Sequence, residues 1–298
     1  MSGVILCVGA LSLDTIFRLD ALPTGPGKFL PTEALQVAQG MATAQAATIV
    51  RLGGKARLWA SCGDDATGDR IVDDLSDAGI DLSALRRVIG ARSGFSSIFM
   101  DSAGERMIVP RYDPALTSAS EIMPAMEDVA VVSVDVRWPE AAMRALALGH
   151  DCDLPCLADL DVGPKDVLLP LFHNATHAIA SEGGAKVLTG EPTGLDALKA
   201  MAREHPGFVA VTMGEHGSFW ADRTTGTLRH VAPFAVDAVD TLAAGDVFHG
   251  AFALGLAEGW DDARNMRFAS AAAALKCTRF GGRLGAPTRD EVEALLGR

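Results

Sequence analysis

Short apolar runs alternate with amphipathic stretches along most of the chain, and this alternation restricts the possible folds more than any other feature. The runs are apolar throughout, as strands buried on both faces of a parallel sheet are. The stretches between them have helical periodicity, and helices supply the crossovers between parallel strands. The sequence therefore predicts an α/β fold with a mostly parallel sheet between two helical layers. The expected strands are 4–10, 56–62, 129–135, 154–159, 177–181 and 208–213, and the expected helices are 42–52, 69–78, 139–150, 194–204 and 264–277, with a last helix from about 288.

Two stretches break this alternation and predict a separate β-structure. Residues 17–37 contain the turn-forming run PTGPG and no long helical face, and residues 93–110 read as a hairpin around SAGE. We interpret both as parts of a small β-sheet lid over residues about 11–40 and 90–113 of a single domain, 1–298. Two irregular surface loops are the alternative. Exposed strands of such a lid invite pairing with a second copy, so a homodimer is expected.

Charge and composition exclude several classes of function. The chain has 26 basic and 38 acidic side chains and a formal net charge of −12. Such a chain repels a phosphate backbone, so general nucleic-acid binding is not expected, whereas a small phosphorylated ligand remains compatible. No apolar run approaches the roughly 18–20 residues that a bilayer span needs, so no membrane association is expected. The five cysteines are scattered, which favours reduced thiols in a cytoplasmic protein over disulfides or a zinc site.

The segment DTLAAGDVFHG at 240–250 is the clearest candidate for chemistry. Its small residues let backbone N–H groups approach a ligand. They also precede the first turn of a predicted helix, where N–H groups are unpaired and the helix dipole is positive. These features predict a pocket for a phosphoryl group. Asp246 beside this pocket could take a proton from an attacking hydroxyl, or it could simply stabilise the start of the helix, and the spacing leaves both alternatives open.

The same segment resembles the D-T-x-(G/A)-A-G-D signature of the pfkB, or ribokinase-like, family of carbohydrate kinases. Three further motifs occur in the family's order: a glycine before a helix that ends in R-L-G, a G-x-D-x-x-G motif and a T-x-G-x-x-G motif. The resemblance therefore covers nearly the whole chain and implies a three-layer α/β/α body. The matching residues are Asp14 in the opening segment, Gln39–Gly40 with 51–53, and the segments 62–68, 211–217 and 240–246.

The resemblance implies a kinase that transfers the γ-phosphoryl group of ATP to a sugar hydroxyl. Mg²⁺ is expected as a cofactor because the charge that develops on the phosphate must be neutralised. A monovalent cation is left open as a further cofactor. In this sequence the resemblance assigns Asp246 as the catalytic base, Ala243, Ala244 and Gly245 as the anion hole, Asp14 and Gly40 to sugar hydroxyls, and Thr212, Gly214 and Gly217 to the nucleotide.

Within this family the chain most resembles the 6-deoxy-6-sulfofructose kinases. The residues that carry this narrower resemblance include Gly27-Lys28, the segment 135–138 and the segment 274–283. It implies that Lys28 and Arg137 face a sulfonate, and the preferred substrate is a ketohexose-type sugar with an anionic group at C6. The alternatives are fructose, ribose, 2-keto-3-deoxygluconate or a nucleoside as acceptor, or a catalytically silent sugar-binding regulator built on the same fold.

Three positions depart from the family pattern. Ala44 replaces the family's usual asparagine, and the nearby Gln39 could supply the missing amide hydrogen bond to the sugar. The metal-site motif N-x-x-E is not kept, which leaves Glu182 as a weak candidate that would act on Mg²⁺ through water. Pro110 takes the place of a lid asparagine, so Arg111 is the alternative group to hold a phosphate or sulfonate through paired N–H donors.

Overall fold

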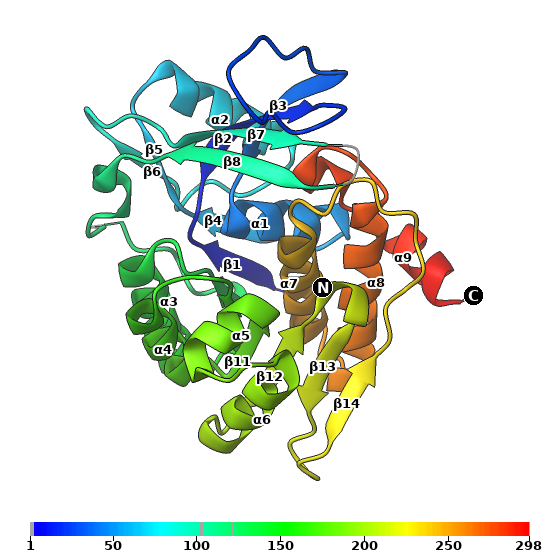
Figure 1. Ribbon diagram of the computed structural model, residues 1–298. Helices are drawn as coiled ribbons and strands as arrows, with labels where there is room; N and C mark the ends of the chain where they lie inside the picture. The colour runs from blue at the N-terminus through cyan, green and yellow to red at the C-terminus, as the bar shows by residue number, and fades with distance from the viewer. Residues whose placement is uncertain (1–2, 102–103, 121, 298) are drawn as a thin grey trace.

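The computed structural model describes residues 3–101, 104–120 and 122–297, and its largest element is a sheet with the strand order β14-β13-β12-β11-β10-β9-β1-β4 (Figure 1). The six strands from β4 to β12 in this order run parallel, and β13 and β14 are antiparallel at one edge. The strands are β1 (Val4–Val8), β4 (Ala56–Trp59), β9 (Val129–Val134), β10 (Cys156–Leu160), β11 (His177–Ser181), β12 (Phe208–Thr212), β13 (Ser218–Ala221) and β14 (Leu228–Val231).

Helices cover both faces of this large sheet, because its strands are apolar on both sides. Neighbouring residues show this directly: Val131 belongs to the core on one face and Val132 to the core on the other. The first core lies under α1 (Met41–Arg51), α7 (Ala244–Ala257) and α8 (Asp262–Cys277), with α9 (Arg289–Leu296) outside α8. The second lies under α3 (Pro139–Asp151), α4 (Lys165–Asn174), α5 (Glu182–Thr189) and α6 (Gly194–Glu204).

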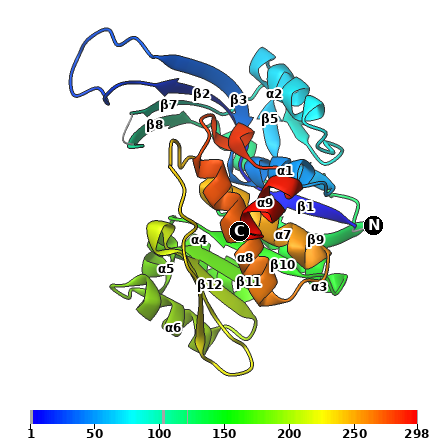
Figure 2. The ribbon, with the colours of Figure 1, turned by 90° about the vertical axis from the view of Figure 1, so that its right-hand side faces the viewer.

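A second sheet, here called the small sheet, lies across one end of the body (Figure 2). It has the order β3-β2-β7-β8, with β2 and β7 parallel and both outer pairs antiparallel. On its inner face Ile16, Val37 and Ile98 form an apolar cluster against Leu242 and Phe280 of the body. Its strands are β2 (Ser12–Arg18), β3 (Glu33–Gln39), β7 (Phe95–Met100) and β8 (Arg106–Arg111).

A short two-stranded sheet and several single turns complete the chain. Helix α2 (Ala66–Asp77) follows β5 (Ser61–Gly63), which pairs with β6 (Arg86–Val88). The 3₁₀ turns are η1 (Pro114–Thr117), η2 (Gly214–His216) and η3 (Gly282–Gly285). No helix in the described parts of the chain is long and apolar enough to cross a membrane. All five cysteines are free thiols, as predicted.

The predicted fold class is confirmed. The sequence did not predict α4 and α5. Helix α4 contains Pro170, which lacks an N–H donor, and α5 begins with Glu182 followed by two glycines. Both helices are instead stabilised by packing, since Leu168, Leu171 and Leu188 are buried in the core on their face of the large sheet.

Candidate active site

The carboxyl ends of the parallel strands meet beneath the small sheet, and they bring several acidic side chains together. Asp135, directly after β9, is fully buried and accepts hydrogen bonds from the backbone N–H groups of Ala10 (2.8 Å), Ala42 (2.9 Å) and Arg137 (2.7 Å). It therefore joins the end of β1 to the start of α1 and to the turn after β9. A Cβ atom at Gly9 would lie 2.1 Å from this carboxyl group, so the close approach requires glycine there.

Helix α7 begins beside the acidic side chains at the strand ends, and no side chain caps its first turn. Ala243 before its first turn adopts the left-handed conformation, with φ 63°, which is uncommon for a residue other than glycine. Uncapped N–H groups of a first turn attract an anion. The structure thus places Ala243, Ala244 and Gly245 around the start of α7, with Asp246 in its first turn. The sequence predicted a helix start at these residues, and their role as an anion pocket stays a prediction.

Asp246 is half-buried among like charges. Burial and the carboxylates of Asp159, Asp135 and Asp161 raise its pKa well above the ordinary value, and Arg137 partly opposes this effect. A carboxylate with a raised pKa holds a proton more strongly and is a better general base. The environment therefore suits Asp246 to proton abstraction, which the alternative of helix stabilisation does not require.

Two neighbours of Asp246 are held by other polar groups. Asp159 is buried and accepts from Gln45 Nε2 at 2.9 Å, with His249 Nδ1 at 3.3 Å. Asp161 is more accessible: its Oδ1 accepts from Ser181 Oγ at 2.9 Å, and its Oδ2 lies 3.6 Å from Arg137 Nη2. Arg137 therefore extends from the end of β9 toward the acidic group.

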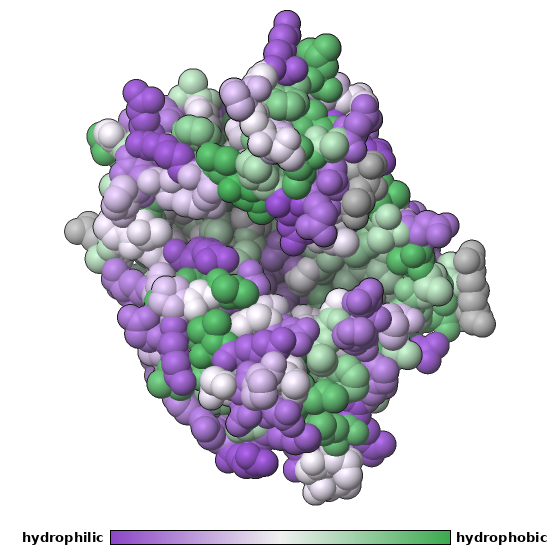
Figure 3. Space-filling model, viewed as in Figure 1, coloured by the Kyte–Doolittle hydropathy of each residue, from purple (hydrophilic) through white to green (hydrophobic). Residues whose placement is uncertain are grey.

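A second polar group lies on the inner side of the small sheet. Asp14 on β2 is buried and accepts hydrogen bonds from Ser12 Oγ (2.8 Å) and Ser96 Oγ (2.6 Å), and burial raises its pKa. Tyr112, just after β8, is also close. Burial and the charge of Asp14 raise the pKa of Tyr112, and a hydrogen bond with Ser12 and the charge of Arg137 lower it. The space-filling view shows the surface hollowed between the small sheet and the body (Figure 3).

Gly40 is needed where the small sheet meets the body. It lies between β3 and α1 with φ 124°, and a Cβ atom there would lie 2.3 Å from the carbonyl oxygen of Ala10. Any side chain at this position would push the start of α1 away from the loop that follows β1. Glycine therefore keeps the first turn of α1 close to Asp14 and Asp135.

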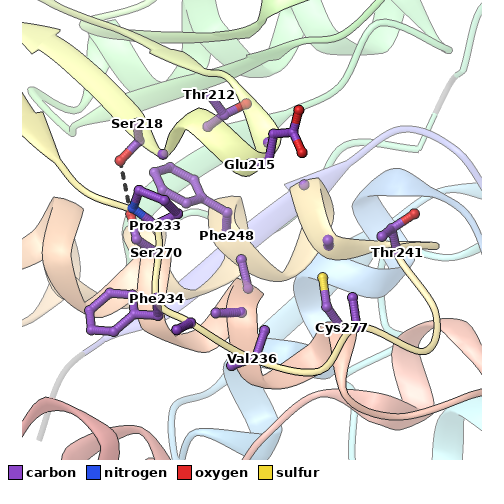
Figure 4. Close-up of a pocket in the computed structure, with 18 residues that line it drawn as sticks. Thr212, Glu215, Ser218, Pro233, Phe234, Val236, Thr241, Phe248, Ser270 and Cys277 are labelled. Atoms are coloured by element: carbon purple, nitrogen blue, oxygen red, sulfur yellow. Dashed lines mark hydrogen bonds between the residues drawn. The ribbon is translucent and has the colours of Figure 1, made fainter. Parts of the chain in front are cut away.

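A cavity of about 590 Å³ opens on the other side of the anion pocket (Figure 4). Thr212, Gly214 and Gly217 line one wall, and Ala244 and Gly245 line another, so the residues expected at the nucleotide share a cavity with part of the expected anion hole. Its walls are mostly apolar and small, which suits a flat aromatic base. Wall residues that the sequence did not single out include Pro233, Phe234, Val236, Phe248, Ser270 and Cys277.

Four residues predicted from the sequence lie away from this arrangement. Gly27 and Lys28 are in the exposed stretch 24–32 of the segment that projects from the end of the β2–β3 pair (Figure 2). Arg111 is separated from Arg106 by an odd number of positions along β8, and Arg106 faces the body through its hydrogen bond to Thr241. Because side chains alternate along a strand, Arg111 lies on the outer face of the small sheet. Gln39 Oε1 accepts from the Arg283 backbone at 3.3 Å, which turns its amide toward η3.

The candidate metal residue Glu182 begins α5 and forms an ion pair with Lys186 at 2.6 Å. Among the residues that the structure describes, no group of three or more His, Cys, Asp or Glu side chains could hold a metal ion. Mg²⁺ usually binds one or two carboxylates and completes its shell with water and phosphate oxygens. Asp161 and Glu182, at the ends of β10 and β11, are both partly exposed and provide such a set.

Sequence reasoning missed Tyr112 and Asp159. Tyr112 is the only tyrosine of the chain and follows Arg111 directly. The register of β8, had it been known, would have selected Tyr112 instead of Arg111 as the residue on the inner side of the small sheet. Asp159 closes a strand-like run next to the one that ends in Asp135, and their shared position at a strand end was an available signal. The contact of Arg106 with Thr241 spans 135 positions, so the sequence does not display it.

Comparisons with known proteins agree with this arrangement. The family described as "pfkB family carbohydrate kinase" matches residues 4–289. Among curated proteins, the ribokinase of Bacillus subtilis is 29% identical over 98% of this chain and 99% of its own length. An ATP-dependent ribose-1-phosphate kinase of Halopiger xanaduensis is 30% identical over 98% of this chain and 97% of its own length.

Solved structures show the same likeness over the full length. A protein of Agrobacterium tumefaciens, provisionally assigned as a ribokinase, has a TM-score of 0.96 and 46% identity over 100% of both chains. The ribokinase of Arabidopsis thaliana, solved with ribose and ATP, has a TM-score of 0.83 and 24% identity over 100% of both chains. At this lower identity the likeness concerns the fold.

Proposed function

The chain belongs to the pfkB family of carbohydrate kinases and is an ATP-dependent sugar kinase, and we propose that its acceptor is a ketohexose-type sugar with an anionic group at C6, 6-deoxy-6-sulfofructose first. The observation that carries this proposal is the position of Arg137, whose Nη2 lies 3.6 Å from Asp161 Oδ2 and whose charge acts on both Asp246 and Tyr112. The family assignment inferred from the sequence is confirmed. An enzyme is thereby favoured over a silent sugar-binding regulator.

In the proposed reaction, Asp246 takes the proton of a primary sugar hydroxyl as that oxygen attacks the γ-phosphorus of ATP. The N–H groups at 243–245 stabilise the charge that develops on the phosphoryl oxygens. The cavity lined by Thr212, Gly214 and Gly217 holds the nucleotide base, on the far side of the anion pocket from Asp14. The two substrates thus approach the start of α7 from opposite sides.

A bound Mg²⁺ ion would neutralise part of the triphosphate charge, and Asp161 and Glu182 would hold it, directly or through water. Ser181 Oγ fixes the Asp161 carboxylate by its 2.9 Å hydrogen bond and also caps α5, which begins with Glu182. This shared serine keeps both carboxylates at the edge of the sheet where the phosphates are expected.

The sugar is proposed to bind between the small sheet and the body. Asp14 and the backbone at Gly40 receive sugar hydroxyls, and Arg137 receives the anionic group through charge-assisted hydrogen bonds. A relative that shares 30% identity is named for a sugar phosphate, which supports an anionic acceptor. Tyr112 adds a hydroxyl donor on the same side. The small sheet then acts as a lid that excludes water from the phosphoryl group.

Ribose is the second candidate acceptor, because curated relatives over the full length are named ribokinases. The experiment that distinguishes these acceptors measures ADP formation from ATP in the presence of Mg²⁺ and each sugar of a panel. The panel contains sulfofructose, fructose 6-phosphate, fructose, ribose, ribose 1-phosphate, 2-keto-3-deoxygluconate and a nucleoside. A higher kcat/KM for sulfonated or phosphorylated ketoses than for every neutral sugar supports the proposal. Preference for ribose or another neutral sugar overturns it and leaves the kinase assignment intact.

We expect the pH dependence of kcat to reflect the raised pKa of Asp246. This carboxylate must be ionised to accept a proton, so the rate falls as the pH drops through a pKa above the usual value of about 4. In Asp161→Asn one repelling charge is lost and Arg137 is freed to attract Asp246. The acid limb should move to lower pH by up to about one unit. Profiles of kcat against pH for both proteins measure this shift, and coincident acid limbs would contradict it.

We also propose a homodimer through the outer face of the small sheet. Phe17 and Phe99 stack there at 5.4 Å, and Phe95, Met107 and Val109 are 45%, 42% and 55% exposed. These side chains form an apolar surface on a sheet whose other face already packs against the body. A second copy of this face would cover it through a two-fold axis.

Val109→Lys is expected to shift the protein from dimer to monomer, because it places a charge on this apolar surface. Sedimentation velocity at working concentration measures the shift. Ile89→Lys is the matched control, since Ile89 is 89% exposed and lies outside the small sheet. A monomeric wild-type protein, or equal behaviour of both variants, argues against this interface.

A further inference from the structure

Lys276, in the last turn of α8, is a buried cation with no role in the site described above. Its side chain and that of Asp240 are both 0% exposed. The Nζ atom lies 2.7 Å from the carbonyl oxygen of Asp240, 3.0 Å from Asp240 Oδ2 and 3.4 Å from the carbonyl oxygen of Arg279. All three partners are acceptors, so Nζ uses three donors, which only the charged ammonium form has.

Asp240 connects this ammonium group to the anion pocket. Its Oδ1 accepts from the backbone of Leu242 at 2.7 Å, and this hydrogen bond shapes the turn that enters the 243–245 segment. Its Oδ2 accepts from the backbones of Gly281 (3.0 Å) and Gly282 (3.1 Å). The Lys276–Asp240 pair therefore joins the end of α8 and the turn at 281–282 to the turn before the anion pocket.

The atoms around Nζ form a donor set that a bound alkali cation would also take: carbonyl and carboxylate oxygens in a closed cage. The sequence left open whether a monovalent cation is a further cofactor. The charge of such a cation would act most directly on the proposed phosphate site from the turn before the anion pocket. Here that charge is covalently attached to the chain. Burial lowers the pKa of Lys276 while the charge of Asp240 opposes this, and the geometry of three acceptors retains the proton.

We propose that Lys276 is a built-in cation that positions the turn before the anion pocket, so that this kinase needs no exchangeable monovalent cation. Lys276 is a positioning residue, since it acts through Asp240 and touches neither substrate. The proposal rests on the proposed assignment of 243–245 as the anion pocket. Without the ammonium group, Asp240 is a buried, unpaired charge beside this pocket.

The first test uses thermal unfolding, which does not depend on the substrate. Lys276→Ala removes the ammonium and leaves its oxygen cage open, so K⁺ should raise the Tm of this variant relative to tetramethylammonium at equal ionic strength. The Tm of the wild-type protein should be equal in both salts. Lys276→Met fills the same space without charge and should not respond to K⁺. A wild-type Tm that rises selectively with K⁺, or a folded Lys276→Ala protein that does not respond, overturns the proposal.

The second test uses phosphoryl transfer with the best sugar of the panel. The wild-type rate should be the same in potassium, sodium and tetramethylammonium salts. Lys276→Ala should lose about tenfold to hundredfold in kcat, as expected for a buried charge left unpaired, and K⁺ or methylammonium should restore part of the rate. Lys199→Ala, at an exposed lysine of α6, is the control. Activation of the wild-type protein by K⁺ refutes the inference about Lys276 and leaves the assignment as a kinase intact. Absence of phosphoryl transfer with every sugar refutes the proposed function and leaves the Tm test valid.

Discussion

Asp246→Asn should lower kcat by about 10²- to 10⁴-fold, because loss of a general base costs that much in typical enzymes. The KM for ATP should change little, since the amide keeps the size of the side chain and the cavity for the base lies beyond it. The free energy of unfolding should not fall. The raised pKa means that ionisation of Asp246 opposes folding above its unfolded pKa, and a neutral amide removes repulsion from Asp159, Asp135 and Asp161.

Steady-state kinetics measure kcat and the KM for ATP, and calorimetry measures the binding of ATP. Thermal unfolding measures the change in stability. Asp262→Asn is the matched control, because Asp262 is the acidic residue in the first turn of α8. If Asp246 only stabilises a helix start, both variants lose a similar, small amount of stability and keep their activity. A rate close to that of the wild-type protein in Asp246→Asn would remove this carboxylate from the mechanism.

Arg137→Met should reduce kcat/KM for an anionic ketohexose by about tenfold to hundredfold, since a hydrogen bond to a charged group contributes about 1.5–3 kcal/mol. A neutral sugar should lose much less, because it makes no ion pair there. The ratio of the two kcat/KM values is the informative quantity. Equal losses would mean that Arg137 serves mainly as the partner of Asp161, which lies 3.6 Å away, and would contradict an anion site.

Lys28→Met and Arg111→Met extend this test to the other two cations proposed from the sequence. Lys28 lies in the exposed stretch 24–32, and Arg111 lies on the outer face of the small sheet. From these positions we expect neither variant to change the ratio between anionic and neutral sugars. A selective loss in either one would show that the segment or the strand rearranges when the sugar binds.

The large sheet and the proposed phosphate site were accessible to sequence reasoning for a clear reason. Strands buried on both faces are continuous apolar runs, and polar residues at their ends mark the edge where ligands bind. The run 240–246 also carries its chemistry in consecutive residues, so Asp246 and its small neighbours can be recognised without tertiary information. Both features depend on local sequence, which a single chain displays directly.

The other parts of the site depend on register and packing. Whether Arg111 or Tyr112 faces the sugar is decided by one position in β8, which the hairpin pattern does not fix. Gln39 Oε1 accepts a hydrogen bond from the backbone of Arg283, more than 240 positions away. Lys276 reads as an ordinary basic residue in the last turn of a helix, and only the folded chain shows that it is enclosed.

The hydrogen bond between Arg106 Nη1 and Thr241 Oγ1, 2.7 Å long, makes the two halves of the molecule interdependent. Outward rotation of the small sheet would break it and loosen the turn that leads to the phosphate site. By thermodynamic reciprocity, whatever orders that turn from the nucleotide side also favours the inward position of the sheet. We therefore expect binding of one reactant to raise the affinity for the other, and release of the first product to weaken binding of the second.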